Sequence, residues 1–100
     1  MAEARTANNQ AYSLAASLDL LAAQTLRDDL LERFHGDGGL TISAEAVERI
    51  STPCIEVLVA TSNAFSGTER KFRVESSSAC FDDAMHTLGL TEYLVRWRQT

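Results

Sequence analysis

The fold is decided by the stretch LTISAEAVERISTPCIEVLVATSNAF, residues 40–65. Residues 40–44 alternate apolar and polar side chains, and this period of two predicts a half-buried strand. From Ile55 onward the apolar side chains recur every three or four positions, which predicts a helix with one buried face. We expect Thr52 to be the N-cap of this helix and Pro53 to occupy its first position, because proline needs no backbone donor there.

The chain before this stretch contains a second strong helical pattern. Residues 22–34 place leucine, alanine and phenylalanine side chains on one face and charged side chains elsewhere, which predicts a helix. The segment Gly36-Asp37-Gly38-Gly39 then ends it, because glycine adopts left-handed backbone conformations without a Cβ penalty. A short strand is expected around residues 12–18, where apolar residues alternate with smaller or polar ones.

The C-terminal third combines a strand, a helix and an expected last strand. Residues 71–75 alternate and predict a strand, and residues 79–88 carry a helical apolar stripe that Ser78 is placed to cap. Over residues 92–98 aromatic and apolar residues alternate with others, which favours a final strand. Trp97 is then either a core residue or an exposed anchor, and the sequence leaves both open.

Helices that separate short strands predict an α/β fold, with a small mixed sheet and helices packed on one side. Within it, parallel pairing is natural for the strand-helix-strand units at residues 40–75 and 71–97. The length of 100 residues suits one small domain. We expect that domain to cover residues 11–100, after a flexible polar leader at residues 1–10.

The composition narrows the class of partner and the location. The net charge of −5 argues against nucleic acid or an anionic membrane as the partner. No apolar run approaches the roughly 20 residues that span a bilayer, so no membrane insertion is expected. Residues 1–10 lack the apolar segment of a secretory signal, which favours a cytoplasmic protein with reduced thiols.

The motifs of enzymes and cofactor sites are missing from the sequence. The glycine cluster at residues 36–39 lacks the lysine and hydroxyl of a phosphate-binding loop and precedes a strand, not a helix. Cys54 and Cys80 match no metal or redox spacing, and His35 and His86 have no companion at ligand spacing. The sequence therefore predicts no catalytic residues, no metal and no cofactor.

Three blocks of the sequence resemble the STAS domain family, to which the bacterial anti-anti-sigma factors belong. The blocks follow one another in the family's order. The first is Ser17-Leu18-Asp19 with Ala23-Gln24-Thr25-Leu26-Arg27, and the second is Leu40-Thr41-Ile42-Ser43 leading into Ser51-Thr52-Pro53-Cys54-Ile55. The third runs from Phe81 to Leu88-Gly89-Leu90. The resemblance covers residues 12–97. The second block and the small size are also similar to the STAS proteins of the CheS type, which are encoded with chemotaxis genes.

The resemblance implies a partner-binding surface around the start of the second helix, together with the exposed side of that helix. It implies no catalysis by the chain itself. Carried over by position, the surface consists of Ser51, Thr52, Pro53, Cys54, Ile55, Glu56 and Asn63. Thr61, Ser62, Asp28 and Asp29 are further candidates for its edges.

The same motif departs from the family where a phosphate would be received. Ser51 stands at the acidic position, and Thr52 stands at the first hydroxyl. Pro53 replaces the second hydroxyl, the usual phosphoacceptor, and Cys54 replaces the glycine. Thr52 and Ser51 still carry hydroxyl groups that a kinase can phosphorylate. The differences from the family motif nevertheless favour a turn that binds its partner without being phosphorylated.

The resemblance therefore implies a non-enzymatic regulatory or adaptor protein. Its expected partner is a signalling histidine kinase similar to the chemotaxis kinase CheA, whose phosphate flow to a response regulator it would modulate. Two alternatives are a phosphorylation-controlled anti-anti-sigma factor and the STAS subunit of a lipid-transport ATPase. A structural module within a larger assembly and a thiol switch at Cys54 also stay open, as does self-association.

Overall fold

A computed structural model of the chain describes residues 11–36 and 38–99, with the backbone alone at Gln99. The expected leader at residues 1–10 lies outside the described residues. The elements are β1 (Tyr12–Ser13), β2 (Ser17–Leu18), α2 (Ala22–Phe34), β3 (Leu40–Ala44), β4 (Arg49–Ile50), α3 (Thr52–Ser66), β5 (Phe72–Ser77), α4 (Ala79–Thr87) and α5 (Thr91–Gln99). The mixed α/β class is confirmed.

The sheet is built from β1, β3 and β5 in that order, and β2 pairs with β4 in a separate small ladder. Every pairing among the described strands is parallel. This confirms the parallel pairing expected for the unit at residues 40–75, whereas the mixed sheet expected for the fold as a whole is wrong. The physical reason is the crossover helix between successive strands, which returns the chain to the same end of the sheet. A register shift between Ile42 and Ser43 interrupts the β3–β5 ladder.

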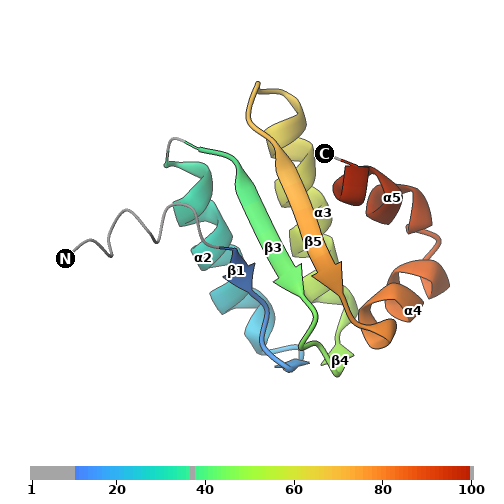
Figure 1. The fold of residues 1–100 in the computed structure, drawn as a ribbon. Helices are drawn as coiled ribbons and strands as arrows, with labels where there is room; N and C mark the ends of the chain where they lie inside the picture. The colour runs from blue at the N-terminus through green and yellow to red at the C-terminus, as the bar shows by residue number, and fades with distance from the viewer. Residues whose placement is uncertain (1–10, 37, 100) are drawn as a thin grey trace.

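One face of this sheet is covered by helices, as the sequence predicted. Figure 1 shows α2 and α3 side by side behind the strands, and α5 beside β5. The covered face buries alternate residues of β3, among them Ile42 and Ala44, and Val74 of β5. The residues between them, such as Ser43 and Arg73, lie on the other face and keep contact with solvent.

The backbone just before β3 approaches the backbone just before β5 very closely. Gly39 lies against Lys71, and a Cβ at Gly39 would stand 2.6 Å from the Lys71 carbonyl oxygen. The Leu40 N–H donates to that same oxygen at 2.8 Å. Only glycine leaves room for this approach, so the glycine cluster serves strand pairing as well as ending α2.

The start of α3 differs from the expected one by one position. Ser51 is the N-cap, with an extended backbone, and Thr52 is the first helical residue. The Ser51 carbonyl accepts from the N–H groups of Cys54 and Ile55, while its hydroxyl makes no capping hydrogen bond. Thr52 as N-cap is therefore wrong, because the extended residue that supplies this carbonyl is Ser51.

The start of α4 confirms the cap predicted from the sequence. The Ser78 hydroxyl accepts from the Phe81 N–H at 3.1 Å and donates to the Val47 carbonyl at 2.6 Å. Asp82 lies in the first turn, where the positive end of the helix dipole favours a carboxylate. Ser78 thus joins the helix start to the connector before β4.

The expected strand at residues 92–98 is wrong, because this segment forms the helix α5. Alternation would place Val95 on the buried side with Trp97, yet Val95 is 47% exposed. Burial instead follows Leu94 and Trp97, with Leu90 half-buried one turn earlier, which is helical spacing. Trp97 is only 2% exposed and belongs to the core.

Tyr12 connects β1 to α2, and its contribution to stability can be measured through the pH dependence of unfolding. The Tyr12 hydroxyl donates to the Asp29 carboxylate at 2.6 Å, and Arg33 stacks on its ring. Burial, and then the hydrogen bond and charge of Asp29, raise the pKa of Tyr12 from 10.0 to about 12, against a smaller opposing effect of Arg33.

We expect the stability that Tyr12 contributes to be complete below pH 10 and to be lost as the pH rises toward 12. A raised pKa in the folded state means that the unfolded chain releases the proton first, so unfolding becomes more favourable over this interval. Urea unfolding of the wild type and of Tyr12→Phe between pH 8 and 11.5 measures it. A difference between the two proteins that does not shrink above pH 10 contradicts the assignment.

Candidate functional site

The exposed side of α3 forms a ridge, which we define by Thr52, Glu56, Ala60 and Asn63. These residues recur at spacings of three or four and therefore share one face of the helix. All four are exposed, and their side chains are small or polar. The ridge runs from the turn singled out in the sequence along most of the helix.

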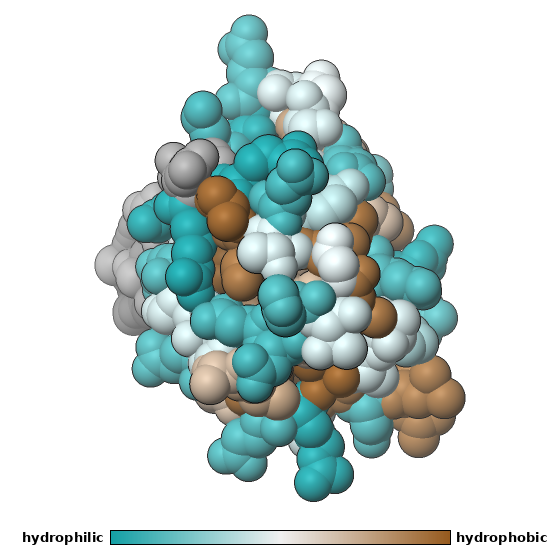
Figure 2. Space-filling model, turned by 90° about the vertical axis from the view of Figure 1, so that its right-hand side faces the viewer, coloured by the Kyte–Doolittle hydropathy of each residue, from teal (hydrophilic) through white to brown (hydrophobic). Residues whose placement is uncertain are grey.

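A hollow of about 410 Å³ lies on the α4 and α5 side of the ridge, and we call it the upper hollow. Its lining residues are Thr52, Ile55, Glu56, Val59, Ala60, Asn63, Leu88 and Leu90. Leu88 is 41% exposed at the end of α4. Figure 2 views the molecule from the side of α4 and α5 in Figure 1, and apolar patches interrupt a mainly hydrophilic face there.

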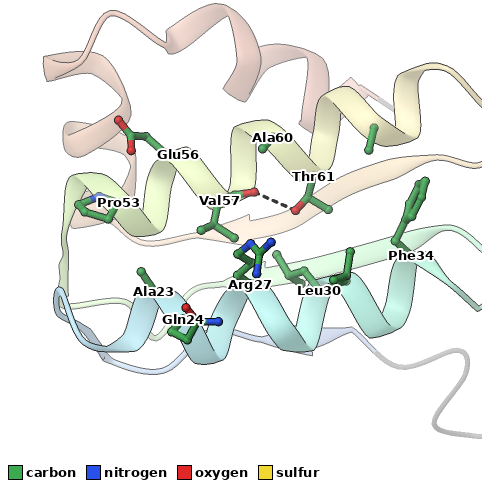
Figure 3. A pocket seen from close by; sticks show the side chains of 12 residues that line it. Ala23, Gln24, Arg27, Leu30, Phe34, Pro53, Glu56, Val57, Ala60 and Thr61 are labelled. Carbon is green, nitrogen blue, oxygen red and sulfur yellow. Dashed lines mark hydrogen bonds between the residues drawn. The ribbon is translucent and has the colours of Figure 1, made fainter.

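A larger groove of about 500 Å³ lies on the other side of the ridge, between α2 and α3. Figure 3 shows α2 below and α3 above, with Pro53 near one end and Phe34 near the other. Arg27 projects from α2 across the groove toward Val57. The α2–α3 groove is lined by Ala23, Gln24, Arg27, Leu30, Leu31, Phe34, Pro53, Glu56, Val57, Ala60, Thr61 and Ala64.

The two hydroxyls of the turn have different environments. Thr52 is exposed at the first position of α3. The Ser51 hydroxyl oxygen is buried and has no hydrogen-bond partner among the described residues. A kinase active site can therefore reach Thr52 directly, whereas Ser51 becomes accessible only when the turn opens.

Cys54 and Ile55 lie beneath the surface that the sequence assigned to them. Their exposed fractions are 0% and 1%, so their side chains support the turn from the core side. The Cys54 thiol donates to the Asp19 carbonyl at 3.4 Å and so connects the turn to the entry of α2. A buried thiol has little access to oxidants, which disfavours the thiol switch.

Of the other residues that the sequence assigned to the surface, some lie on the ridge or in the groove and others lie elsewhere. Glu56 and Asn63 lie on the ridge, and Thr61 lines the α2–α3 groove while donating to the Val57 carbonyl at 2.8 Å (Figure 3). Ser62 instead faces α5, where its hydroxyl accepts from the Trp97 indole at 2.7 Å. Asp29 accepts from Tyr12 as described, and Asp28 is exposed on α2.

Metal-binding clusters and membrane-spanning helices are both absent from the described residues. Among residues 11–36 and 38–99 no three His, Cys, Asp or Glu side chains gather closely enough to hold a metal ion. His86 lies on α4, and its ring nitrogen Nδ1 is 3.2 Å from the Thr91 hydroxyl oxygen. In the same part of the chain, no helix has both the length and the apolar character needed to cross a membrane.

On α2 the sequence indicated only Asp28 and Asp29, and not the residues that line the groove, and it did not indicate Leu88 and Leu90. The packing of α2 against α3 places Leu31 in one groove with Ala64, and the turn after α4 places Leu88 in one hollow with the ridge residues. The available signal was Leu31 itself, which is apolar but stands outside the buried positions Leu26 and Leu30 of its helix.

Comparison with models of known protein families, with curated proteins and with solved structures gives no match to this chain. The features of the chain that bear on function are therefore the ridge with its two hollows and the motif at residues 51–55.

Proposed function

We propose that the chain is a STAS-like regulatory protein that binds a signalling histidine kinase of the CheA type and modulates phosphate flow to a response regulator. It does so without catalysing a reaction, by binding one conformation of the kinase more tightly than another. The location is the cytoplasm, where such kinases have their catalytic domains. The family resemblance supplies the identity of the partner.

The observation that carries the proposal is the ridge with an apolar hollow on each side. Such a surface is polar along the ridge and apolar in the hollows on either side. It suits a partner that buries the apolar hollows and forms hydrogen bonds with the polar residues around them. Buried Cys54 and Ile55 fix the turn beneath Thr52, so the surface is already formed before the partner arrives. The helices on one face of the sheet agree with the STAS-like arrangement, whereas the parallel pairing of the described strands departs from the mixed sheet expected with it.

The substitution Thr52→Glu is expected to weaken binding of the chemotaxis kinase at least tenfold, about 1.4 kcal/mol. A carboxylate at this position adds a charge and bulk to the crest of the ridge while remaining compatible with a helix N-terminus. Isothermal titration of the purified kinase with each variant measures the affinity.

The matched control is Thr25→Glu, an exposed threonine on α2 that lines neither the groove nor the upper hollow. This variant is expected to bind like the wild type. Equal affinities of the two variants, with both folded by circular dichroism, remove the turn from the interface. Failure of the wild-type chain to bind the kinase at all overturns the proposed partner.

A second candidate is favoured by the exposure of Thr52. In a phosphorylation-controlled anti-anti-sigma factor, a phosphate on Thr52 would add about −1.5 to −2 charges at the start of α3 and block a partner. Incubation with the cognate anti-sigma kinase, followed by intact-mass measurement, separates the two functions. A phosphate mapped to Thr52 supports the anti-anti-sigma factor.

A further inference from the structure

The two walls of the α2–α3 groove carry exposed residues in the same order and at the same spacing. The α2 wall has Arg27 and, four positions later, Leu31. The α3 wall has Glu56 and, four positions later, Ala60. Residues four apart lie on one face of a helix, about 6 Å apart along its axis. Both helices run in the same direction along the groove, as Figure 3 shows, so the charged residue comes first in each wall.

The charges of the two walls are opposite. Among the described residues that line the groove, the charged ones are Arg27 on α2 and Glu56 on α3. The Arg27 guanidinium lies 4.0 Å from the Asp28 carboxylate, but the two side chains are 63% and 62% exposed, and such a surface pair contributes little. Glu56 is exposed and forms no ion pair with any residue of the described part of the chain. Both charges can therefore pair with a partner.

The apolar residues of the two walls differ in size. Leu31 is 45% exposed on the α2 wall. Ala60 and Ala64 are exposed on the α3 wall, and their short side chains leave room for a larger side chain to lie against them. A large exposed apolar side chain beside a hollow is typical of an interaction site.

These two walls complement each other, which identifies a second copy of the chain as the partner. A two-fold axis along the groove places α2 of one copy over α3 of the other and keeps the helices running in the same direction. Arg27 projects toward Val57, the residue after Glu56 (Figure 3), so its long side chain reaches Glu56 of the other copy. One turn further along, Leu31 lies over the alanines of the opposite wall.

We propose that two copies of this chain associate through the α2–α3 groove in a two-fold symmetric dimer, with each Arg27 against Glu56 of the other copy. Each contact occurs twice because the interface is self-complementary. The inference goes beyond the proposed function and uses no property of the kinase. Glu56 and Ala60 also belong to the ridge, so the dimer covers part of the expected kinase surface and competes with the kinase for it.

The first test is sedimentation equilibrium of the full chain up to about 0.5 mM, which is expected to show a monomer–dimer equilibrium. A salt concentration of about 0.15 M screens the repulsion between two copies of net charge −5. Arg27→Glu and Glu56→Arg each place like charges at both contacts and are expected to weaken the dimer at least tenfold. A wild-type chain that stays monomeric, or single variants that dimerise like the wild type, overturns the proposal.

Mixing the two variants tests the pairing itself. In an equimolar mixture each contact joins opposite charges again, because one copy carries glutamate and the other arginine at both positions. The mixture is therefore expected to form a heterodimer with a Kd within about threefold of the wild-type value. The double variant Arg27→Glu/Glu56→Arg is expected to regain the dimer for the same reason. A mixture and a double variant that both stay monomeric overturn the pairing, and circular dichroism confirms that each variant is folded.

A matched pair of leucines separates the groove from the upper hollow. Leu31, in the groove, and Leu88, in the upper hollow, are 45% and 41% exposed, so glutamine at either site has a similar effect on folding. Leu31→Gln is expected to weaken the dimer at least fivefold, and Leu88→Gln to leave it unchanged. The reverse order, or equal losses, overturns the groove as the interface. These measurements contain no kinase, so their outcome is independent of the proposed function.

Discussion

Replacement of Trp97 by alanine is expected to lower the free energy of unfolding by about 3–5 kcal/mol, since it removes a large buried side chain. The indole is 2% exposed and packs its ring against Phe72, with centroids 5.2 Å apart, and against Tyr93 at 5.9 Å. Its N–H donates to the Ser62 hydroxyl at 2.7 Å, so the substitution also removes the partner of a half-buried hydroxyl. Trp97 thus joins α5 to both α3 and β5.

Urea unfolding followed by circular dichroism measures the loss, with Val95→Ala as the control. Val95 lies on the same helix but is 47% exposed, and its substitution is expected to change the free energy of unfolding by less than about 0.5 kcal/mol. Trp97→Phe keeps an aromatic ring and is expected to lose about half as much as Trp97→Ala. A loss for Trp97→Ala within 1 kcal/mol of the Val95 control contradicts the docking of α5 on the sheet.

Replacement of Phe65 by alanine is expected to cost a similar amount, about 3–5 kcal/mol, for a different structural reason. Phe65 is 1% exposed and lies between two other rings, with centroids 5.1 Å from Phe34 and 6.1 Å from Phe72. The Arg70 guanidinium stacks on both Phe65 and Phe34. From there it donates hydrogen bonds to the carbonyls of Phe34 and Gly36 at the end of α2.

Loss of the Phe65 ring therefore removes core volume and the platform of the arginine that holds the end of α2. Phe65→Leu refills part of the cavity and is expected to lose less than half as much. Ser66→Ala, at the next and exposed position of α3, is the control and is expected to change little. A loss below about 1 kcal/mol for Phe65→Ala, measured by urea unfolding, contradicts the central position of this ring.

Much of the fold could be read from local patterns. The helix at residues 22–34 and the strand at residues 40–44 have the bounds that periodicity predicts, and Ser78 caps α4 as expected. These elements have clear start or stop signals in the sequence, either a glycine cluster or a capping hydroxyl, so neighbouring residues alone determine where they begin and end. Pro53 marked the start of α3 only to within one residue, because it is the second helical residue and not the first.

The errors arose where two patterns coincide or where one residue decides the geometry. Tyr93 and Trp97 are four positions apart, which suits both an alternating strand and a helix, and only the exposure of Val95 separates the two. At the start of α3, Ser51 and Thr52 are both good caps by composition. The extended backbone of Ser51, set by the neighbouring ladder of β2 and β4, makes it the cap.

The candidate site also has features that the sequence predicted and features that it did not. The sequence located the turn at residues 51–55 and the exposed residues Glu56 and Asn63, because these follow from a motif and from one helix's periodicity. It could not show that Cys54 and Ile55 are buried or that two hollows flank the ridge. Those features depend on which elements pack against α3.

The sequence by itself determined the α/β class, the positions of α2, α4, β3 and β5 and the turn at the start of α3, since these depend on residues close together in the chain. The single strand expected at residues 12–18 is instead two short strands, β1 and β2, which belong to different ladders. Only the tertiary structure decided that residues 91–99 form a helix, that β1 joins β3 in the sheet while β2 and β4 pair separately, and that α2 and α3 leave a groove between them. Such features depend on side chains that are distant in sequence and meet when the core is buried, and burial of the apolar face is the energy that selects among local alternatives.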